Sequence, residues 1–292
     1  CFAAITAQNA GLDVVLLERK SKEEAGYIAC GDALKGKSTF PDVLDRDRLA
    51  EESFSNPNIT RAVFENPQSD EVINIPFGDS KGAVVDRYRY GQVLLDETRR
   101  AGVDIQYETV VKDVVQDNGS ITGVSGVQNG DAVTFTAPIT IDGAGALSIL
   151  QDSADFSGAT FDTNVNYQQF CSAYREILEV EEPVEWDDAI VFKPTKELGY
   201  LWYFPRSPTV INAGLGFQMN KPPMKLVESL KQDLRSRPEF KGASVRETLG
   251  GKDKLGAALP TRRPYDSAVA PGFMAVGDAA GHVNPTTGGG IP

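Results

Sequence analysis

The densest group of residues that could bind a ligand is the run 277–291, Gly-Asp-Ala-Ala-Gly-His-Val-Asn-Pro-Thr-Thr-Gly-Gly-Gly-Ile. It follows the apolar segment 272–276, which we predict to be a buried strand. Asp278 would stand at the end of that strand, where its carboxylate can accept a hydrogen bond from a ribose or ribityl hydroxyl. The glycines up to Gly290 let backbone N–H groups approach an anionic group, and the start of a helix would add positive potential. A simple surface turn before a helix is the alternative, which the density of Gly, Pro and Asp disfavours.

A second acid, Glu18, ends the predicted strand 13–18, which follows a predicted helix over 1–10. In dinucleotide-binding folds, an acid at this place accepts hydrogen bonds from the hydroxyls of the adenosine ribose. A glycine turn ending just before Cys1 would give about the usual spacing of roughly 20 residues to that acid. Acids also end strands at the surface, so Glu18 alone leaves both interpretations open.

Tyr200, Trp202 and Phe204 are aromatic residues at every second position of one predicted strand. Because successive side chains of a strand point to opposite faces, these three share one face. Such a face suits a long apolar ligand that offers no polar group. An ordinary sheet core is the alternative.

Three motifs together resemble known flavoproteins. The run 277–291 resembles the second FAD fingerprint of the glutathione-reductase-like flavoproteins, in the branch shared by aromatic hydroxylases and geranylgeranyl reductases. Segment 142–148, Asp-Gly-Ala-Gly-Ala-Leu-Ser, is similar to the Asp-Gly motif of that branch. Segment 199–205, Gly-Tyr-Leu-Trp-Tyr-Phe-Pro, followed by Asn-Ala-Gly-Leu-Gly at 212–216, resembles the Tyr-x-Trp-x-Phe-Pro motif of geranylgeranyl reductases. The resemblance covers residues 1–292 and is closest to archaeal enzymes that saturate the isoprenoid chains of ether lipids.

The resemblance implies FAD as the cofactor and assigns site residues by motif. Cys30 lies in a Cys-Gly loop that the family places beside the flavin ring, although a lone cysteine is usually a small buried hydrophobe. Arg87 ends a Val-Asp-Arg motif, and the chain departs from the family pattern just after it, at Tyr90-Gly91. The full set of implied FAD contacts is Glu18, Cys30, Gly31, Ala33, Arg87, Val111, Asp278, Gly290 and Ile291. The implied substrate contacts are Tyr200, Trp202 and Phe204, and the candidate proton donors are Cys30 and Tyr200.

The reaction implied by the resemblance is reduction of isolated C=C bonds in geranylgeranyl chains of a polyprenyl ether lipid. Ferredoxin and NAD(P)H remain open as electron donors. One alternative is an FAD-dependent monooxygenase of the aromatic-hydroxylase type, and another is a lipid-binding flavoprotein without catalytic activity. The fragment character of the chain is a further expectation, since it begins at Cys1 inside a predicted helix and ends where another should begin. Without the first glycine turn, we expect the purified fragment to be colourless.

Composition and net charge limit the classes of partner and the location that we expect for the protein. The net charge of −12 and the pI near 4.7 argue against nucleic acid, which requires clustered Lys and Arg. An acidic surface favours a high-salt, halophilic origin, although ordinary acidic cytosolic proteins look similar. Three cysteines without a Cys-x-x-Cys pair and a single histidine, His282, predict a reducing, cytoplasmic location and no metal site. No apolar stretch reaches the roughly 20 residues needed to cross a bilayer, so we expect a soluble chain, with contact at the membrane periphery for a lipid substrate.

The elements that would position these residues form an α/β (α+β) pattern. The resemblance implies a glutathione-reductase-like FAD-binding Rossmann domain interrupted by an antiparallel-sheet substrate domain. We assign residues 1–60, 86–155 and 261–292 to the first domain, and residues 61–85 and 156–260 to the second. The remaining predicted elements are helices over 86–101 and 224–236, strands over 104–108, 110–116, 120–128 and 131–141, and hairpin turns at Asn118-Gly119 and Asn129-Gly130.

Overall fold

The structure of the chain is a computed structural model, in which the chain forms two compact units. Unit 1 comprises Cys1–Ala25, Asp96–Phe170 and Ala258–Gly290, and unit 2 comprises Gly26–Leu95, Cys171–Ala257 and Ile291–Pro292. Each unit is described by itself. The residues that the structure describes are 1–28, 30–36, 42–154, 156, 170–195, 199–218, 223–248, 257–261, 267–285 and 287–290.

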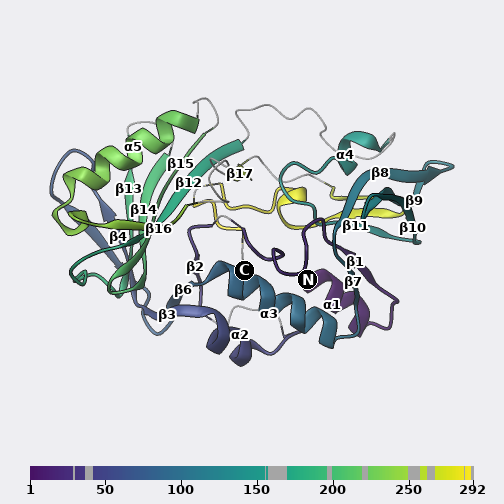
Figure 1. Cartoon of the computed structure of the whole chain (residues 1–292), viewed down its shortest axis with the longest axis horizontal. Helices are drawn as coiled ribbons and strands as arrows, with labels where there is room; N and C mark the ends of the chain where they lie inside the picture. Colours follow the sequence, from purple (N-terminus) through teal and green to yellow (C-terminus); the bar gives the residue numbers. More distant parts are fainter. Residues whose placement is uncertain are drawn as a thin grey trace. The chain divides into compact units, whose positions relative to one another are not determined.

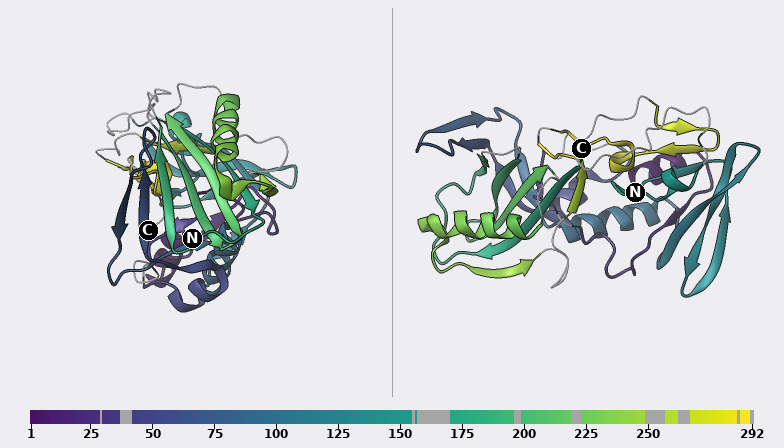
Figure 2. Two further views of the ribbon diagram at one scale, coloured as in Figure 1. Left: turned by 90° about the vertical axis from the view of Figure 1, so that its left-hand side faces the viewer. Right: turned by 90° about the horizontal axis from the view of Figure 1, so that it is seen from above.

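Unit 1 contains three small sheets (Figure 1). In the first, β1 pairs in parallel with β7, and in the second β11 pairs in parallel with β19, which also pairs with β18. The third is the antiparallel sheet β10-β9-β8, whose strands lie side by side in Figure 2. The bounds are α1 Phe2–Asn9, β1 Val15–Leu17, β7 Asp104–Gln106, β8 Thr109–Asp117, β9 Ser120–Gln128, β10 Asp131–Thr136, β11 Thr140–Asp142, α4 Leu150–Ser153, β18 Val269–Ala270, β19 Phe273–Ala275 and the 3₁₀ helix η4 Gly277–Ala280.

Both predicted hairpin turns are confirmed. Asn118 and Gly119 have φ of 48° and 78°, and Asn129 and Gly130 have φ of 52° and 94°. Two consecutive positive φ values make the type I′ turn that matches the twist of antiparallel strands, and Asn-Gly is the pair that adopts it most easily. The predicted strand 131–141 is instead two strands, β10 and β11, with Pro138 between them. Proline has no N–H to donate to a ladder, so pairing stops there.

Unit 2 contains a small sheet, β2-β6-β3, and a large one in which the strands follow the order β16-β12-β15-β14-β13-β4-β5. Helix α5 lies along strands of the large sheet (Figures 1 and 2). Its Leu230 is fully buried in the apolar cluster on that face, together with Tyr203, Ile211 and Leu215. The bounds are β2 Ala33–Leu34, α2 Arg46–Ser53, β3 Phe54–Ile59, β4 Arg61–Glu65, β5 Val72–Pro76, β6 Gly82–Val85, α3 Arg87–Arg100, β12 Phe170–Glu179, β13 Ala189–Pro194, β14 Gly199–Ser207, β15 Val210–Gln218, α5 Pro223–Ser236, η3 Pro238–Phe240, β16 Ser244–Thr248 and β17 Ala257–Pro260, of which α3, β12 and β17 extend into unit 1.

Helix α2 was not among the predicted elements, although its N-terminus carries a local signal. Asp45 accepts a hydrogen bond from the Arg48 N–H at 3.0 Å, which is the geometry of an N-cap. Strand β3 follows at once and pairs with β6, as β2 does. Residues 26–60 therefore lie in the same compact unit as the large sheet, whereas the predicted domain limits join them to residues 86–155. The predicted domain limits are drawn by which segments bind the cofactor. The compact units do not test that division, so the predicted limits remain a prediction.

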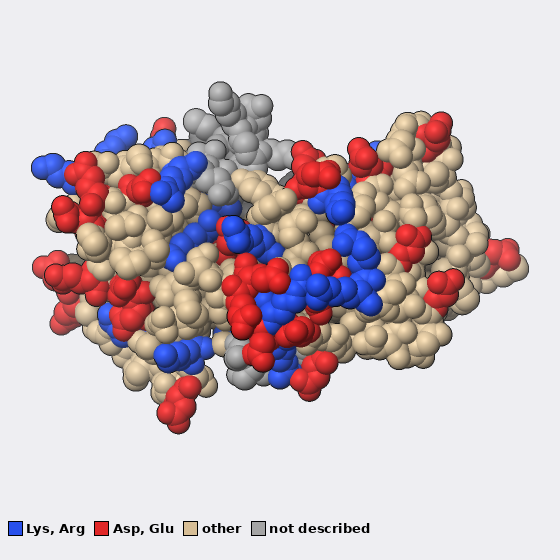
Figure 3. All heavy atoms as spheres, turned by 60° about the horizontal axis from the view of Figure 1, so that its bottom comes forward, with Lys and Arg blue, Asp and Glu red and all other residues tan. Residues whose placement is uncertain are grey.

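The acidic composition does not produce a uniform surface. Figure 3 shows one face on which Lys and Arg side chains are interspersed with Asp and Glu. At the end of α3, for example, Asp96 pairs with Arg99 at 3.2 Å and Glu97 pairs with Arg100 at 3.3 Å. Among the described helices, none is long and apolar enough to span a membrane.

Candidate functional site

The loop that contains Cys30 packs directly against the aromatic face of β14. A Cβ atom on Gly31 would lie 2.9 Å from Cε2 of Phe204 and 3.5 Å from Nε1 of Trp202. Real Cβ atoms do not approach other atoms so closely, so only glycine allows this contact. Ala33, in β2, also packs beside the same aromatic cluster and pairs with Val84 of β6.

Tyr200, Trp202 and Phe204 share one face of β14, as predicted. Ring centroids of Tyr200 and Trp202 are 6.0 Å apart, those of Trp202 and Phe204 are 6.2 Å apart, and Phe192 contacts both ends of the row. Trp202 and Phe204 are 6% and 5% exposed, as in ordinary sheet core, whereas Tyr200 is partly exposed. Tyr200 is therefore the member of the row that a ligand reaches most easily.

A buried polar network connects this loop to the large sheet. Asp32 is fully buried, and its Oδ2 accepts hydrogen bonds from Nη2 of Arg206 at 2.6 Å and from Nδ2 of Asn212 at 2.7 Å. Asn212 also donates to the carbonyl oxygen of Cys30 at 3.0 Å and accepts from Nε1 of Trp202 at 3.0 Å. The sequence motif included Asn212 without a role, and nothing in the local sequence marked Arg206.

Burial controls the protonation of this loop. It raises the pKa of the Cys30 thiol, and the negative charge of Asp32 raises it further, whereas Arg87 and Arg175 lower it. Burial also raises the pKa of Asp32 against the opposing charges of Arg206 and Arg175. The thiol is therefore protonated at neutral pH, so it can donate a proton and is a poor nucleophile.

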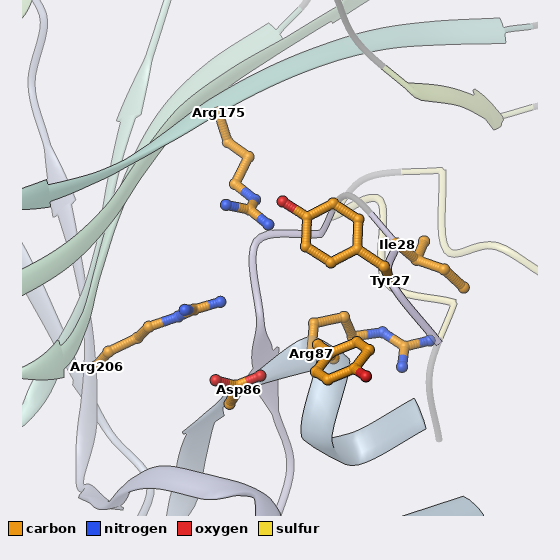
Figure 4. Close-up of a pocket in the computed structure, with 7 residues that line it drawn as sticks. Tyr27, Ile28, Asp86, Arg87, Arg175 and Arg206 are labelled. Atoms are coloured by element: carbon orange, nitrogen blue, oxygen red, sulfur yellow. The ribbon is translucent and has the colours of Figure 1, made fainter. Parts of the chain in front are cut away.

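A cavity of about 300 Å³ lies at the start of α3 in unit 2. Figure 4 shows Arg175 and Arg206 reaching from the large sheet toward Tyr27 and Asp86. Arg87 lines the same cavity and places its guanidinium 4.9 Å from the Tyr90 ring. Its Nε is buried without a hydrogen-bond partner among the described residues. The three arginines that line the cavity, Arg87, Arg175 and Arg206, fit an electron-rich or anionic group such as a flavin.

In unit 1, Glu18 stands at the carboxyl end of β1, where the sequence placed it. Its backbone N–H donates to Gln106, its carbonyl accepts from Thr109, and its carboxylate accepts from the N–H of Lys20 at 2.9 Å. Val111 lies on β8 and packs beside the apolar core of this unit.

Asp278 and Gly290 lie close together in unit 1. Asp278 lies in η4 directly after β19, and a Cβ atom on Gly290 would lie 3.0 Å from its Oδ1. A glycine at 290 therefore allows the backbone to lie close to the carboxylate. Ile291, the last predicted cofactor contact, lies outside the described residues.

Hydrogen bonds connect Asp142, the first residue of the Asp-Gly motif, to the turn that carries Asp278. Asp142 is buried, and its Oδ2 accepts a hydrogen bond from Nε2 of Gln151 at 3.0 Å. The same Nε2 donates to the carbonyl oxygen of Ala279 at 2.8 Å, while the N–H of Val276 donates to the Asp142 carbonyl. Gln151 thus links the Asp142 carboxylate to the backbone beside Asp278. In the described part of the chain, no group of three or more His, Cys, Asp or Glu side chains is arranged to hold a metal ion.

The chain is similar to reductases of archaeal lipids over nearly its whole length. It is 29% identical over 297 residues to digeranylgeranylglycerophospholipid reductase 2 of Methanosphaera stadtmanae, covering 99% of this chain and 70% of that protein. It is 27% identical to the digeranylgeranylglycerophospholipid reductase of Methanothrix thermoacetophila, with the same coverage.

Solved structures share the fold. A geranylgeranyl bacteriochlorophyll reductase-like protein of Thermoplasma acidophilum matches with a TM-score of 0.84 at 23% identity, covering 99% of this chain and 70% of that one. A flavin-dependent brominase matches with a TM-score of 0.76 at 17% identity, covering 98% and 72%. The sequence profile of the family described as FAD binding domain matches residues 2–291. The chain therefore belongs to the FAD-binding domain family and, within it, to the geranylgeranyl reductase family, with FAD as cofactor.

Proposed function

We propose that the chain is part of an FAD-dependent reductase that saturates C=C bonds of geranylgeranyl chains in archaeal ether lipids. The observation that carries this proposal is the contact between the Cys30-Gly31 loop and the aromatic face of β14. It brings the loop that carries the Cys30 thiol against an apolar surface, which suits an alkene that needs a proton but offers no polar group. The names of the archaeal relatives support the same substrate class.

We propose that Glu18, Val111, Asp278, Gly290 and Ile291 contact the dinucleotide part of FAD, in a Rossmann domain of the glutathione-reductase type. Glu18 accepts from the adenosine ribose hydroxyls, and Val111 contacts the adenine side through its backbone. Asp278 accepts from a ribose or ribityl hydroxyl, while Gly290 and Ile291 bring backbone N–H groups close to the cofactor. The parallel strands that precede Glu18 and Asp278 support these roles.

Four further residues are proposed to contact the flavin ring. Cys30, Gly31 and Ala33 line it, and Arg87, which lines the cavity at the start of α3, approaches it with its guanidinium. Arg87 in its cavity would also favour negative charge on a reduced flavin. The substrate domain of the proposal comprises residues 61–85 and 156–260, with Tyr200, Trp202 and Phe204 as the substrate surface.

When bound, reduced FAD supplies the hydride equivalent that the reaction requires. The protein must hold the chain in place, exclude water and supply the second hydrogen as a proton. The aromatic row gives apolar contact along an extended chain. The Cys30 Sγ–H is the proposed proton source and Tyr200 the second candidate, since burial holds both groups protonated at neutral pH. An isolated alkene has no carbonyl to polarise, so positioning must supply much of the rate.

Incubation of the full-length reduced enzyme with an unsaturated archaeal phospholipid tests the proposal by mass spectrometry. A gain of about two mass units per double bond supports a reductase, whereas about sixteen would indicate the monooxygenase alternative. Lipid binding without any mass change would indicate a non-catalytic flavoprotein. Reduced ferredoxin and NAD(P)H, supplied separately, identify the electron donor. Sedimentation with lipid vesicles tests the proposed contact of a cytoplasmic protein with the membrane surface.

Two substitutions separate the candidate proton donors. Loss of a general acid costs about 10²–10⁴-fold in rate. We expect Cys30→Ala to lower turnover by that factor and Tyr200→Phe, which keeps the ring, to lower it only slightly. The reverse result would assign the proton to Tyr200.

A further inference from the structure

Asn212 is the point at which the Cys30 loop and the aromatic face of β14 meet. It lies on β15, is fully buried, and pairs across the sheet with Phe204. Its side chain makes three hydrogen bonds: from Nδ2 to the Cys30 carbonyl oxygen and to Oδ2 of Asp32, and from Nε1 of Trp202 to Oδ1. One amide on β15 therefore connects the Cys30–Asp32 loop to Trp202 on β14.

The partners fix the orientation of this amide. Both atoms that face Nδ2 are acceptors, a carbonyl and a carboxylate oxygen, and the atom that faces Oδ1 is an indole N–H, which can only donate. A flipped amide would put oxygen against two oxygens and leave the indole donor unsatisfied. No side chain other than asparagine offers two donors and one acceptor at this length, so the site requires asparagine.

We propose that Asn212 is a positioning residue that ties the Cys30–Asp32 loop to the Trp202 ring, so that thiol and aromatic face keep one arrangement relative to an alkene. Its importance for reduction rests on the proposed function, but the tie itself can be measured without turnover. Asn212 acts through Cys30 and Trp202 and does not itself touch the reacting atoms.

The chain offers reporters at both ends of the tie. Its two tryptophans are Trp186 and Trp202, and its three cysteines include Cys30. The reference chain therefore carries Cys1→Ser, Cys171→Ser and Trp186→Phe, which leave one thiol and one indole. Maleimide alkylation then reports access to Cys30, and fluorescence with acrylamide quenching reports the surroundings of Trp202.

In this background, Asn212→Ser removes the tie. We expect alkylation of Cys30 to become about tenfold faster, equivalent to about 1.4 kcal/mol in the free energy of loop opening at 25 °C. Trp202 becomes more accessible to quencher. Asn212→Asp keeps the acceptor for Trp202 but places oxygen against Cys30 and Asp32, so it accelerates alkylation while changing Trp202 emission less. Where the reference chain reduces lipid, Asn212→Ser also lowers turnover at saturating lipid.

Asn56 provides a matched control in the same unit. It is also buried and makes three comparable bonds, from Nδ2 to the carbonyls of Asp187 and Pro205 and from the N–H of Asn58 to Oδ1. Asn56→Ser should lower the thermal midpoint but change Cys30 alkylation by less than about twofold.

Equal acceleration by Asn56→Ser and Asn212→Ser would overturn the inference, because general loosening would then explain both. So would an Asn212→Ser variant with unchanged alkylation and quenching. If Asn212→Ser does not fold, Trp202→Phe tests the same tie by alkylation, since it removes only one arm, and an unchanged rate counts against the proposal. A chain that fails to reduce lipid but shows the coupled reporters refutes the proposed reaction and leaves the tie intact.

Discussion

The carboxylate of Asp32 is fully buried against the guanidinium of Arg206, which donates to Oδ2 from Nη2 at 2.6 Å and from Nε at 3.1 Å. Asp32 also has a positive φ of 69°, which is uncommon outside glycine. The ion pair holds this strained residue in place directly after Cys30 and Gly31. It thereby fixes the loop that faces the aromatic row.

Arg206→Met should therefore destabilise the chain strongly. It keeps much of the side-chain volume but removes the cation that hydrogen-bonds to the buried Asp32 carboxylate, a loss of about 3–5 kcal/mol for a buried pair. Urea unfolding measures the loss. Arg246→Met is the control, because Arg246 and Glu179 form a pair with 52% and 42% exposed side chains and should contribute little. Similar losses in both variants would show that the Asp32 pair is no more important than a surface pair.

Gly214 and Gly216 lie on the same face of β15 and should respond differently to alanine. A Cβ atom on Gly214 would lie 2.1 Å from Cζ2 of Trp202, whereas the nearest atom to a Cβ on Gly216 is Sγ of Cys171 at 3.4 Å. Gly214→Ala must displace the indole ring, at a cost of about 1–3 kcal/mol for overpacking. Gly216→Ala should be close to neutral.

Urea unfolding and the emission of Trp202 in a Trp186→Phe background check this pair. We expect Gly214→Ala to shift both and Gly216→Ala to shift neither. Equal behaviour of the two variants would mean that the indole does not lie across Gly214.

Gln151 should be required for the Asp278 turn. Its Nε2 donates to both Asp142 and the carbonyl of Ala279, so Gln151→Met leaves two buried acceptors without this donor, at about 1–3 kcal/mol each. We expect weaker FAD binding as well as lower stability, because the turn carries Asp278. Flavin fluorescence titration measures the affinity, and the exposed Gln68→Met is the control. An unchanged FAD affinity would separate this turn from the cofactor.

Local sequence patterns predicted the elements that depend on a few adjacent residues. The helices predicted over 1–10, 86–101 and 224–236 correspond to α1, α3 and α5, and the two hairpins follow from Asn-Gly, which adopts positive φ at low cost. The shared face of Tyr200, Trp202 and Phe204 follows from the alternation of a strand.

The polar networks could not be predicted in this way. Asp32 and Arg206 are 174 residues apart, and Asn212 and Cys30 are 182 apart. Their contact depends on the strand order of the large sheet and on the place where the Cys30 loop crosses it. The sequence could identify Asp32 and Asn212 as parts of motifs, but it could not show that one amide connects them.

The pH dependence of Cys30 tests the electrostatics of the loop. In a chain with Cys1→Ser and Cys171→Ser, alkylation requires the thiolate, so its midpoint should lie above the ordinary thiol pKa of about 8.5. The folded chain holds this proton more tightly than the unfolded chain does. Its contribution to the unfolding free energy is therefore complete below about pH 8.5 and falls as pH rises through the raised pKa of the folded thiol.

Substitution of the charged neighbours of Cys30 shows in which direction each one shifts the pKa of the thiol. Arg87→Gln removes a positive charge that lowers the thiol pKa, so it should move the alkylation midpoint to still higher pH. Asp32→Asn removes a negative charge that raises it, so it should move the midpoint down. A midpoint below about pH 7 would make Cys30 mostly thiolate at neutral pH, and the proton for the alkene would then have to come from another group.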